Sequence, residues 1–189
     1  MRVVMIAPPG AGKDTQGGLV AAHFGIPRVV IGDVLRGHVA RRTDLGRAIR
    51  AHLDRGELVP DEIVLRLARE ALIDTRRLGG GIVIDGVPRT VAQAQAGYEQ
   101  ARELGMAADV ALHLEADDRE LTRRLLARAE REHRSDDTEP VIRRRLELYH
   151  EVTHPIVEWY RKRRILISVD AMRPIPEVGR DVLAALEAA

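Results

Sequence analysis

A glycine-rich segment near the start of the chain carries residue types that bind phosphate. Residues 7–16 read APPGAGKDTQ and follow the apolar run at residues 3–6, so a buried strand leads into a turn and then a helix. The backbone N–H groups of such a turn can hold phosphate oxygens, helped by the positive end of the helix. Gly10 and Gly12 allow the backbone conformations that the turn needs. Lys13 would then reach the β- and γ-phosphates of a nucleotide.

This segment departs from the usual phosphate-loop pattern, GxxxxGK followed by Ser or Thr. Ala7 stands in place of the first glycine, and Asp14 stands where Ser or Thr is expected, with Thr15 one place later. A plain strand-to-helix turn with an exposed lysine is therefore the alternative. However, only Lys13 and Lys162 are lysines among the 30 basic residues. A lysine at this position, in a chain with only two lysines, favours the phosphate site.

A carboxylate at the end of a second apolar run is the next signal. Residues 82–84 are apolar, and Asp85 follows them directly. In a phosphate-binding protein such a residue commonly holds Mg²⁺, directly or through water, because Mg²⁺ prefers hard oxygen ligands and keeps several waters. Asp85 could instead only cap the turn. The turn through Gly86 and Pro88 directs Arg89 back to the same edge, where it would clamp a phosphate or remain a surface arginine.

Four arginines in the C-terminal half form a third signal. Arg124 and Arg128 are four residues apart and therefore share one face of a helix. Arg134 lies in the strongly charged stretch at residues 130–138, which interrupts a helical pattern and indicates a short flap, and Arg145 lies in the helix that follows. Phosphoryl transfer needs charge neutralisation more than covalent help, so converging arginines suit it. The alternative is strong, because most arginines of this chain must be solvated surface residues.

Apolar runs alternate with helical patterns, which is typical of a parallel sheet covered by helices on both faces. We predict strands at residues 3–6, 29–31, 82–84, 110–114 and 165–169. The helices are expected at residues 15–23, 34–40, 45–55, 63–74, 91–104, 119–131, 141–163 and 176–186. Sheets of this kind bind ligands at the carboxyl ends of their strands, where the glycine turn, Asp33 and Asp85 all fall.

The composition restricts the classes of function. A chain of 189 residues suits one domain with a proper core. Its 30 basic and 29 acidic residues leave a net charge of +1, so no overall attraction to nucleic acid or membrane is expected. The chain has no cysteine, which excludes disulfides and thiolate metal sites. It shows no signal-peptide pattern and no apolar stretch of membrane-spanning length, so we expect a cytoplasmic protein.

Together these segments resemble the adenylate kinases, in the form with a short, metal-free lid, and the match runs nearly end to end. APPGAGKDTQ is similar to the family's phosphate loop, and IGDVLR at residues 31–36 is similar to its TGDxLR segment. DGVPRT at residues 85–90, with Gln93 after it, resembles DGFPRT. Further matches are GELVP at residues 56–60, RSDD at 134–137, RL with YH between 145 and 150, and VD at 169–170.

The resemblance implies a P-loop NTPase fold, an α/β domain with a five-stranded parallel sheet flanked by helices. The single domain, residues 1–189, would have a core (1–29, 61–128 and 139–189), a monophosphate-binding lobe (30–60) and a lid (129–138). The implied activity is reversible phosphoryl transfer from Mg·ATP to AMP, giving two ADP, with Mg²⁺ as the metal and no zinc. ATP and a nucleoside monophosphate would be the partners of a monomer that binds neither nucleic acid nor membrane.

The resemblance also implies a set of site residues. The catalytic residues would be Lys13, Arg89, Arg124, Arg134 and Arg145. The ATP site would comprise Gly10, Ala11, Gly12, Lys13, Asp14, Thr15, Arg128 and Arg173. The monophosphate site would comprise Ile31, Arg36, Glu57, Leu58, Val59, Gly86, Val87, Pro88, Arg89, Gln93, Arg134 and Arg145.

Some of these residues have distinct implied roles. Lys13 would neutralise the transferring phosphate, while Arg124, Arg134 and Arg145 would stabilise its equatorial oxygens. Arg128 would pack over the ATP adenine. The α-phosphate of the monophosphate would be held by Arg36 and Arg89, its adenine edge would be read by the amide of Gln93, and Mg²⁺ would be held by Asp85 through water.

Several positions depart from the family pattern. Ile31 replaces a Thr beside the acceptor base and Val87 replaces an aromatic residue, so the acceptor could be a different monophosphate. Ala171 and Met172 replace Gly and a polar residue where the backbone meets the ATP base. Asp14 replaces a Gly beside the polyphosphate. A like charge about 6 Å away costs about 3 kcal/mol at an effective dielectric constant of about 20, and much less if the side chain faces water. A degenerate nucleotide-binding protein with little kinase activity is therefore the alternative, although the retained arginines argue against it.

Overall fold

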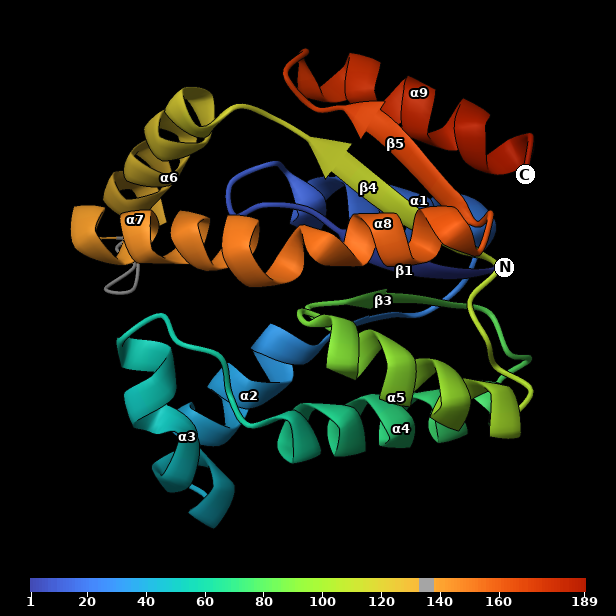
Figure 1. Cartoon of the computed structure of the whole chain (residues 1–189), viewed down its shortest axis with the longest axis horizontal. Coiled ribbons are helices and arrows are strands. Elements are labelled where there is room, and N and C mark those ends of the chain that lie inside the picture. Colours follow the sequence, from blue (N-terminus) through green and yellow to red (C-terminus); the bar gives the residue numbers. More distant parts are fainter. Residues whose placement is uncertain (133–137) are drawn as a thin grey trace.

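The structure is a computed structural model that describes residues 1–132 and 138–189. Five parallel strands form one sheet in the order β2-β3-β1-β4-β5 (Figure 1). The strands are β1 (Arg2–Ile6), β2 (Arg28–Val30), β3 (Ile82–Asp85), β4 (Val110–Glu115) and β5 (Leu166–Asp170). This arrangement confirms the predicted α/β class and the five-stranded parallel sheet of the P-loop NTPase fold.

Both faces of the sheet are covered by helices, and the central strand β1 supplies side chains to both cores. Val3 and Met5 pack on one face with residues of α1 and α9. Val4 and Ile6 pack on the opposite face with residues of α4, α5 and α8. The helices named here are α1 (Lys13–Phe24), α4 (Asp61–Arg77), α5 (Val91–Glu103), α8 (Pro155–Lys162) and α9 (Ile175–Glu187). A strand buried on both faces is apolar throughout, which explains the run at residues 3–6.

Two further helices, α2 (Ile31–Ala40) and α3 (Asp44–Asp54), lie together on the side to which the strands point (Figure 1). The boundary predicted between the strand at residues 29–31 and the helix from residue 34 is wrong. Helix α2 begins at Ile31, which was predicted to end the strand. Val30 keeps an extended backbone as the N-cap, and the Ile31 side chain, 1 % exposed, joins the core from the helix. Apolar β-branched residues fit either element, so propensity could not place this boundary.

Replacing Gly46 with alanine should destabilise the packing of α3 on α2. A Cβ at Gly46 would overlap the backbone carbonyl of His38 and lie 2.7 Å from the backbone nitrogen of Val39. Because backbone cannot turn aside as a side chain can, we expect a loss of about 3 kcal/mol in the free energy of unfolding. Gly97→Ala is the matched control, since its Cβ would lie 3.6 Å from Leu65 Cδ2. Equal urea midpoints for the two variants would contradict the prediction.

The single helix predicted at residues 141–163 is interrupted. The observed elements are α7 (Glu139–Leu148), a π-helical turn (Tyr149–Thr153) and α8 (Pro155–Lys162). Pro155 has no N–H to donate, and a proline ring clashes with the carbonyl four residues earlier, so the helical ladder widens before it. The N–H of His154 accordingly donates to the carbonyl oxygen of Tyr149 at 2.7 Å. This turn places the Tyr149 side chain against β4.

A buried histidine of β4 lies beneath this turn. His113 is 3 % exposed, and its Nε2 lies 2.8 Å from the hydroxyl oxygen of Tyr149. Its Nδ1 lies 3.3 Å from Ser168 Oγ and 3.3 Å from Glu115 Oε1. The neutral ring fits these partners, with Nδ1 donating and Nε2 accepting from the tyrosine. Burial lowers the pKa of His113, the charge of Glu115 opposes this effect, and the charge of His154 adds to it.

His113→Phe should reduce the acid sensitivity of the fold. The pKa of His113 is lowered from 6.5 in the folded protein. Below pH 6.5 the unfolded chain therefore binds a proton at His113, whereas the folded chain stays unprotonated there. The stability contributed by the neutral ring is therefore present above pH 6.5 and lost as the pH falls below it. Between pH 7.5 and 5.5 we expect the free energy of unfolding of the native protein to fall by about 1 kcal/mol more than that of the variant. Urea titrations at both pH values test this, and equal falls would contradict it.

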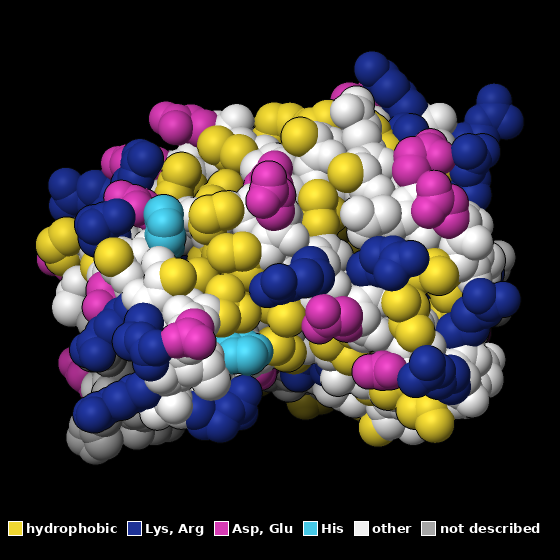
Figure 2. Space-filling model, turned by 90° about the horizontal axis from the view of Figure 1, so that it is seen from below, with side chains coloured by type: hydrophobic (Ala, Val, Ile, Leu, Met, Phe, Trp, Pro, Cys, Tyr) yellow, Lys and Arg dark blue, Asp and Glu magenta, His cyan; other side chains and the backbone are white. Residues whose placement is uncertain are grey.

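The surface mixes both signs of charge. The face shown in Figure 2 carries basic and acidic side chains scattered among apolar ones, in keeping with the net charge of +1. No helix within residues 1–132 and 138–189 is long and apolar enough to cross a membrane. An anion site on this protein must therefore be formed by particular residues rather than by the charge of the whole molecule.

Candidate active site

The loop between β1 and α1 has the backbone features that phosphate binding requires. Gly10 and Gly12 have φ angles of +88° and +82°, in the left-handed region. A Cβ at Gly10 would lie 3.0 Å from both the carbonyl oxygen of Leu121 and Cγ of Leu125, so a side chain there would collide with α6 (Asp118–Glu132). Gly12 is the N-cap of α1, whose first N–H groups and positive end face the loop. The predicted phosphate loop thus forms at the amino end of a helix.

Lys13 and Asp85, predicted at the same edge, form an ion pair. Asp85 ends β3, aligns with Met5 of β1, and has no exposed surface. Lys13 Nζ donates to Asp85 Oδ1, and the lysine side chain remains 23 % exposed. A buried carboxylate next to the phosphate loop is the kind of hard oxygen ligand that suits Mg²⁺, directly or through water. The structure therefore brings together the predicted phosphate-binding lysine and the predicted metal-holding aspartate.

Arg28 is a site residue that no motif indicates. It begins β2, and its Nη2 donates both to Asp85 Oδ2 at 3.0 Å and to Asp14 Oδ1 at 2.6 Å. Asp85 thus has a cation at each carboxylate oxygen, Lys13 at one and Arg28 at the other. A basic residue in an otherwise apolar strand, next to a strand that ends in Asp, is the one signal that could have found it.

Asp14, whose charge is the departure from the family pattern expected to weaken ATP binding most, contacts Arg28. It lies in the first turn of α1, and its side chain is 65 % exposed. Burial alone would raise the pKa of Asp14, but the hydrogen bond from Arg28 and the charges of Lys13, Arg28 and Arg128 lower it. The carboxylate is therefore ionised at neutral pH, and a guanidinium matches its charge.

Arg89, Arg145 and Arg36 form a cluster of like charges near Asp85. Arg89 is an exposed residue, and the protein atoms packed around its guanidinium lower the pKa of Arg89. The like charges of Arg145 and Arg36 lower it further, while Asp85 opposes them. The Nε of Arg89 also donates to the carbonyl oxygen of Gly86 at 3.0 Å. Arg36 also pairs with Asp33. An anion bound among the three guanidinium groups would reduce the repulsion between them, so this cluster is a candidate phosphate site.

The turn at residues 56–60 packs against the stem of Arg145. A Cβ at Gly56, whose φ is +68°, would lie 3.3 Å from Arg145 Cγ. Val59 is 7 % exposed and belongs to the core, while Glu57 accepts two hydrogen bonds from a neighbouring arginine. The turn therefore helps to place the arginine cluster. Direct contacts of an acceptor with Glu57, Leu58 and Val59 stay predictions.

Gln93 holds the turn that carries Arg89. Its side chain is 2 % exposed. Its Oε1 accepts from the backbone N–H of Arg89 at 2.7 Å, and its Nε2 donates to Asp61 Oδ1 at 2.7 Å. Thr90 caps α5 by accepting from the N–H of Gln93 at 3.0 Å. Both ends of the amide are thus used within the protein, and its contact with an adenine edge stays a prediction.

Comparison with known proteins places the chain in a family. The family model described as adenylate kinase matches residues 5–165. The chain belongs to the adenylate kinase family. It is 44 % identical over 187 residues to the adenylate kinase of Thermobifida fusca, covering 99 % of this chain and 98 % of that one. It is also 44 % identical over 184 residues to that of Thermus thermophilus, with 97 % and 96 % covered, and 41 % identical over 186 residues to that of Kocuria rhizophila, with 98 % of each covered. The chain is accordingly an enzyme of the nucleoside monophosphate kinase class.

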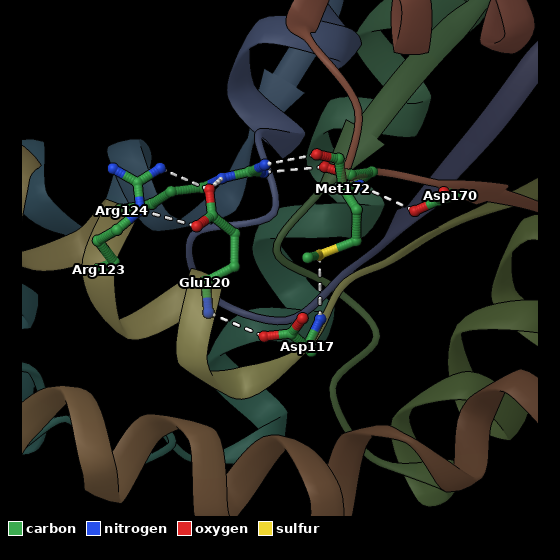
Figure 3. A network of polar contacts seen from close by, with 7 residues as sticks. Asp117, Glu120, Arg123, Arg124, Asp170 and Met172 are labelled. Carbon is green, nitrogen blue, oxygen red and sulfur yellow. Dashed lines mark hydrogen bonds and ion pairs between the residues drawn. The ribbon is translucent and has the colours of Figure 1, made fainter.

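In this member of the adenylate kinase family, Arg124 ties α6 to the loop after β5 (Figure 3). Its Nη1 donates to the carbonyl oxygen of Ala171 at 2.9 Å, and its Nη2 to that of Met172 at 3.4 Å. Its Nε donates to Glu120 Oε1 at 2.7 Å. The N–H of Asp117 also contacts Met172 Sδ at 3.4 Å. Arg124 therefore lies with the segment that the family resemblance places at the ATP base.

Arg128 lies one turn further along α6, toward the phosphate loop, since its charge helps to lower the pKa of Asp14. The family resemblance implies Arg124 at the phosphates and Arg128 over the base. These positions favour the opposite assignment. Arg173, expected at the ATP site, forms ion pairs with Asp181 and Asp170.

Two other expected ATP-site residues belong to the loop and the helix after it: Ala11 is buried, and Thr15 is exposed on α1. Arg134, expected in the lid, lies outside the described residues. Within the described residues, no group of three or more His, Asp or Glu side chains is placed to hold a metal ion. Asp85 would therefore share Mg²⁺ with phosphate oxygens and water, as Mg²⁺ prefers.

Proposed function

We propose that this enzyme reversibly transfers the γ-phosphoryl group of Mg·ATP to AMP, giving two ADP. The observation that carries the proposal is the meeting of Lys13, Asp85 and the Arg89 cluster at one edge of the sheet. The phosphate loop is joined to Asp85 through Lys13, and Asp85 is also close enough to act on the charge of Arg89. Two phosphorylated substrates bound there would meet with their phosphates end to end. The names of the relatives, all adenylate kinases, support AMP as the acceptor.

In the proposed mechanism Lys13 leaves Asp85 and binds the β- and γ-phosphates of ATP. The α-phosphate of AMP lies between Arg36 and Arg89, where it relieves the repulsion between their charges. An oxygen of that phosphate, ionised at neutral pH, attacks the γ-phosphorus as the bond to the β-phosphate oxygen breaks, so no general base is needed. Lys13, Arg128 and Arg145 stabilise the charge on the group in transit, with Arg134 joining them. Alignment of the two substrates supplies most of the rate.

Asp85 is the residue proposed to hold Mg²⁺, through water. Its two carboxylate oxygens already have Lys13 and Arg28 as partners, which suits an indirect contact. When bound, Mg²⁺ would neutralise charge on the β- and γ-phosphates. Orienting that ion is the contribution of this chain.

Residues 30–60 and 129–138 are proposed as a monophosphate-binding lobe and a lid around the core at 1–29, 61–128 and 139–189. The first contains α2 and α3, and the second follows the greater part of α6. In Figure 1, α2 and α3 flank the carboxyl edge of the sheet on one side, and α6 and α7 flank it on the other. Closure of both over the substrates would exclude water, which otherwise competes as the acceptor.

As the family resemblance implies, we propose that the enzyme acts as a monomer, in the cytoplasm, on ATP and a nucleoside monophosphate, without nucleic acid or membrane as a partner. Sedimentation equilibrium at working concentration tests the monomer.

An acceptor other than AMP is the second candidate, because Ile31 and Val87 depart from the family pattern. The two side chains are 1 % and 4 % exposed and belong to the same core cluster. Because both side chains are buried, they would affect an acceptor by shaping the protein surface that lines its site more than by touching it. We expect AMP to remain the preferred acceptor.

Product formation from Mg·ATP with AMP, dAMP, CMP, UMP and GMP, followed by chromatography, tests the proposal. Formation of ADP that depends strongly on AMP is the expected result. Preference for another monophosphate would support the second candidate and point to Ile31 and Val87. A folded protein that transfers to none of them would overturn the proposal and favour the nucleotide-binding alternative motivated by Asp14.

A further inference from the structure

One guanidinium, that of Arg28, joins two carboxylates from different elements at the proposed ATP site. Its Nη2 lies 2.6 Å from Asp14 Oδ1 on α1 and 3.0 Å from Asp85 Oδ2 at the end of β3. Asp85 has no exposed surface, whereas the Asp14 side chain is 65 % exposed at the start of the helix. Arg28 therefore connects the buried carboxylate of the metal site with the unusual carboxylate of the phosphate loop.

The position of Arg28 depends on a glycine one turn beyond Asp14. A Cβ at Gly17 would lie 2.9 Å from Arg28 Nε and 3.5 Å from its Cζ. The guanidinium thus lies directly against the backbone of α1, in space that any side chain at Gly17 would occupy. Within the described residues the buried Nε of Arg28 has no hydrogen-bond partner, so its two carboxylate contacts are what hold the group in place.

The four charges at this edge alternate in sign. Lys13 pairs with Asp85, Asp85 with Arg28, and Arg28 with Asp14. When Lys13 turns to the polyphosphate, Asp85 keeps Arg28 as a partner. Without Arg28, a buried carboxylate and an unmatched carboxylate would both face the incoming phosphates, and each would oppose binding.

We propose that Arg28 is a positioning residue of the ATP site, which neutralises Asp14 and holds Asp85, so that this enzyme tolerates a carboxylate in its phosphate loop. The proposal rests on ATP as a substrate. It goes further in making Asp14 and Arg28 one functional pair, so that the effect of losing Arg28 on ATP binding depends on the charge of Asp14. The lowered pKa of Asp14 agrees with a pairing between full charges.

A double-mutant cycle on ATP binding tests the pair. The variants are Arg28→Gln, Asp14→Asn and the double variant, and the readout is the Kd for Mg·ATP by calorimetry without an acceptor. We expect Arg28→Gln alone to weaken ATP binding about tenfold, and to weaken it less than threefold when Asp14→Asn is also present. The Kd for AMP should change less than twofold in all three, because the arginine cluster is untouched. Equal weakening by Arg28→Gln with and without Asp14→Asn would overturn the proposal, as would no weakening at all.

Further variants separate positioning from a general effect on the fold. Arg28→Lys keeps a positive charge and should restore part of the lost affinity. Gly17→Ala keeps every charge, displaces the guanidinium and should weaken ATP binding, while its helix is no less stable in thermal unfolding. Arg102→Gln, which removes an exposed arginine 2.9 Å from Glu99, is the matched control and should leave ATP binding unchanged.

The two proposals fail differently. If the native protein does not bind Mg·ATP, the proposed function is wrong. If it binds Mg·ATP, but Gly17→Ala binds as tightly as the native protein and Arg28→Lys restores nothing, the positioning role is wrong while the function stands.

Discussion

Lys13→Met should lower kcat/KM for phosphoryl transfer by about a thousandfold while the protein stays folded. Loss of one charged donor that faces developing charge in a site protected from water typically costs about 10²–10³ in rate, and Lys13 contacts both phosphates in the proposed mechanism. The substitution also removes one partner of buried Asp85, but Arg28 stays at the second oxygen. We therefore expect cooperative unfolding at a somewhat lower temperature, checked by calorimetry beside steady-state kinetics.

The scarcity of lysine provides an unusually clean control. Lys162 is the only other lysine, and it is exposed at the end of α8. Lys162→Met should leave kcat/KM within about twofold, since it changes the net charge equally. An amine-selective reagent offers a second check, because saturating ATP should protect Lys13 and leave Lys162 reactive. Equal labelling of Lys13 with and without ATP would contradict its role.

Arg89→Gln should raise the KM for AMP about a hundredfold and leave the KM for ATP nearly unchanged. Hydrogen bonds between charged groups contribute about 1.5–3 kcal/mol each, and a guanidinium can form two of them with one phosphate. The stability of the fold, in contrast to AMP binding, should not decrease. Removing Arg89 relieves its repulsion with Arg145 and Arg36, so the unfolding temperature should be unchanged or higher.

Kinetics and thermal unfolding on the same preparation check both parts. Arg77→Gln is a suitable control, because Arg77 is exposed beside Asp74, at 3.5 Å, at the end of α4. If Arg89→Gln raises the two KM values equally, Arg89 is not specific to the monophosphate. A large fall in the unfolding temperature would show that Arg89 serves the fold instead of the ligand.

The order of elements could be predicted because strands and helices here differ clearly in pattern. Apolar runs such as residues 82–84 are too short for helices and end at turn residues, so the five strands were found. Two boundaries failed for physical reasons. Ile31 could extend a strand or begin a helix, and only the packing of its side chain decided between them. Pro155 opens the helix through a π-helical turn, which leaves the apolar pattern on both sides intact.

The site was predicted where motifs carry chemistry and missed where it depends on contacts across the sheet. Lys13 and Asp85 each follow a recognisable strand, so their meeting could be expected. Arg28 comes from a neighbouring strand, and its role depends on its contacts with Asp14 and Asp85, which no local sequence pattern indicates. The same holds for Gln93, whose amide proves to hold the Arg89 turn, and for Arg124, which bonds the loop after β5.

The central place of β1 in the sheet has a consequence for how the chain reaches its fold. Residues 2–6 lie between β3 and β4, with Val4 aligned to Ile84 on one side and to Ala111 on the other. The first strand to be synthesised therefore gains its neighbours only after α4 and then α5 have followed it. Contacts so distant along the chain slow folding and leave an apolar segment unpaired in the meantime. During its synthesis this protein should depend on its early apolar strand being shielded, by its own first helix or by a chaperone, until the middle of the chain has emerged.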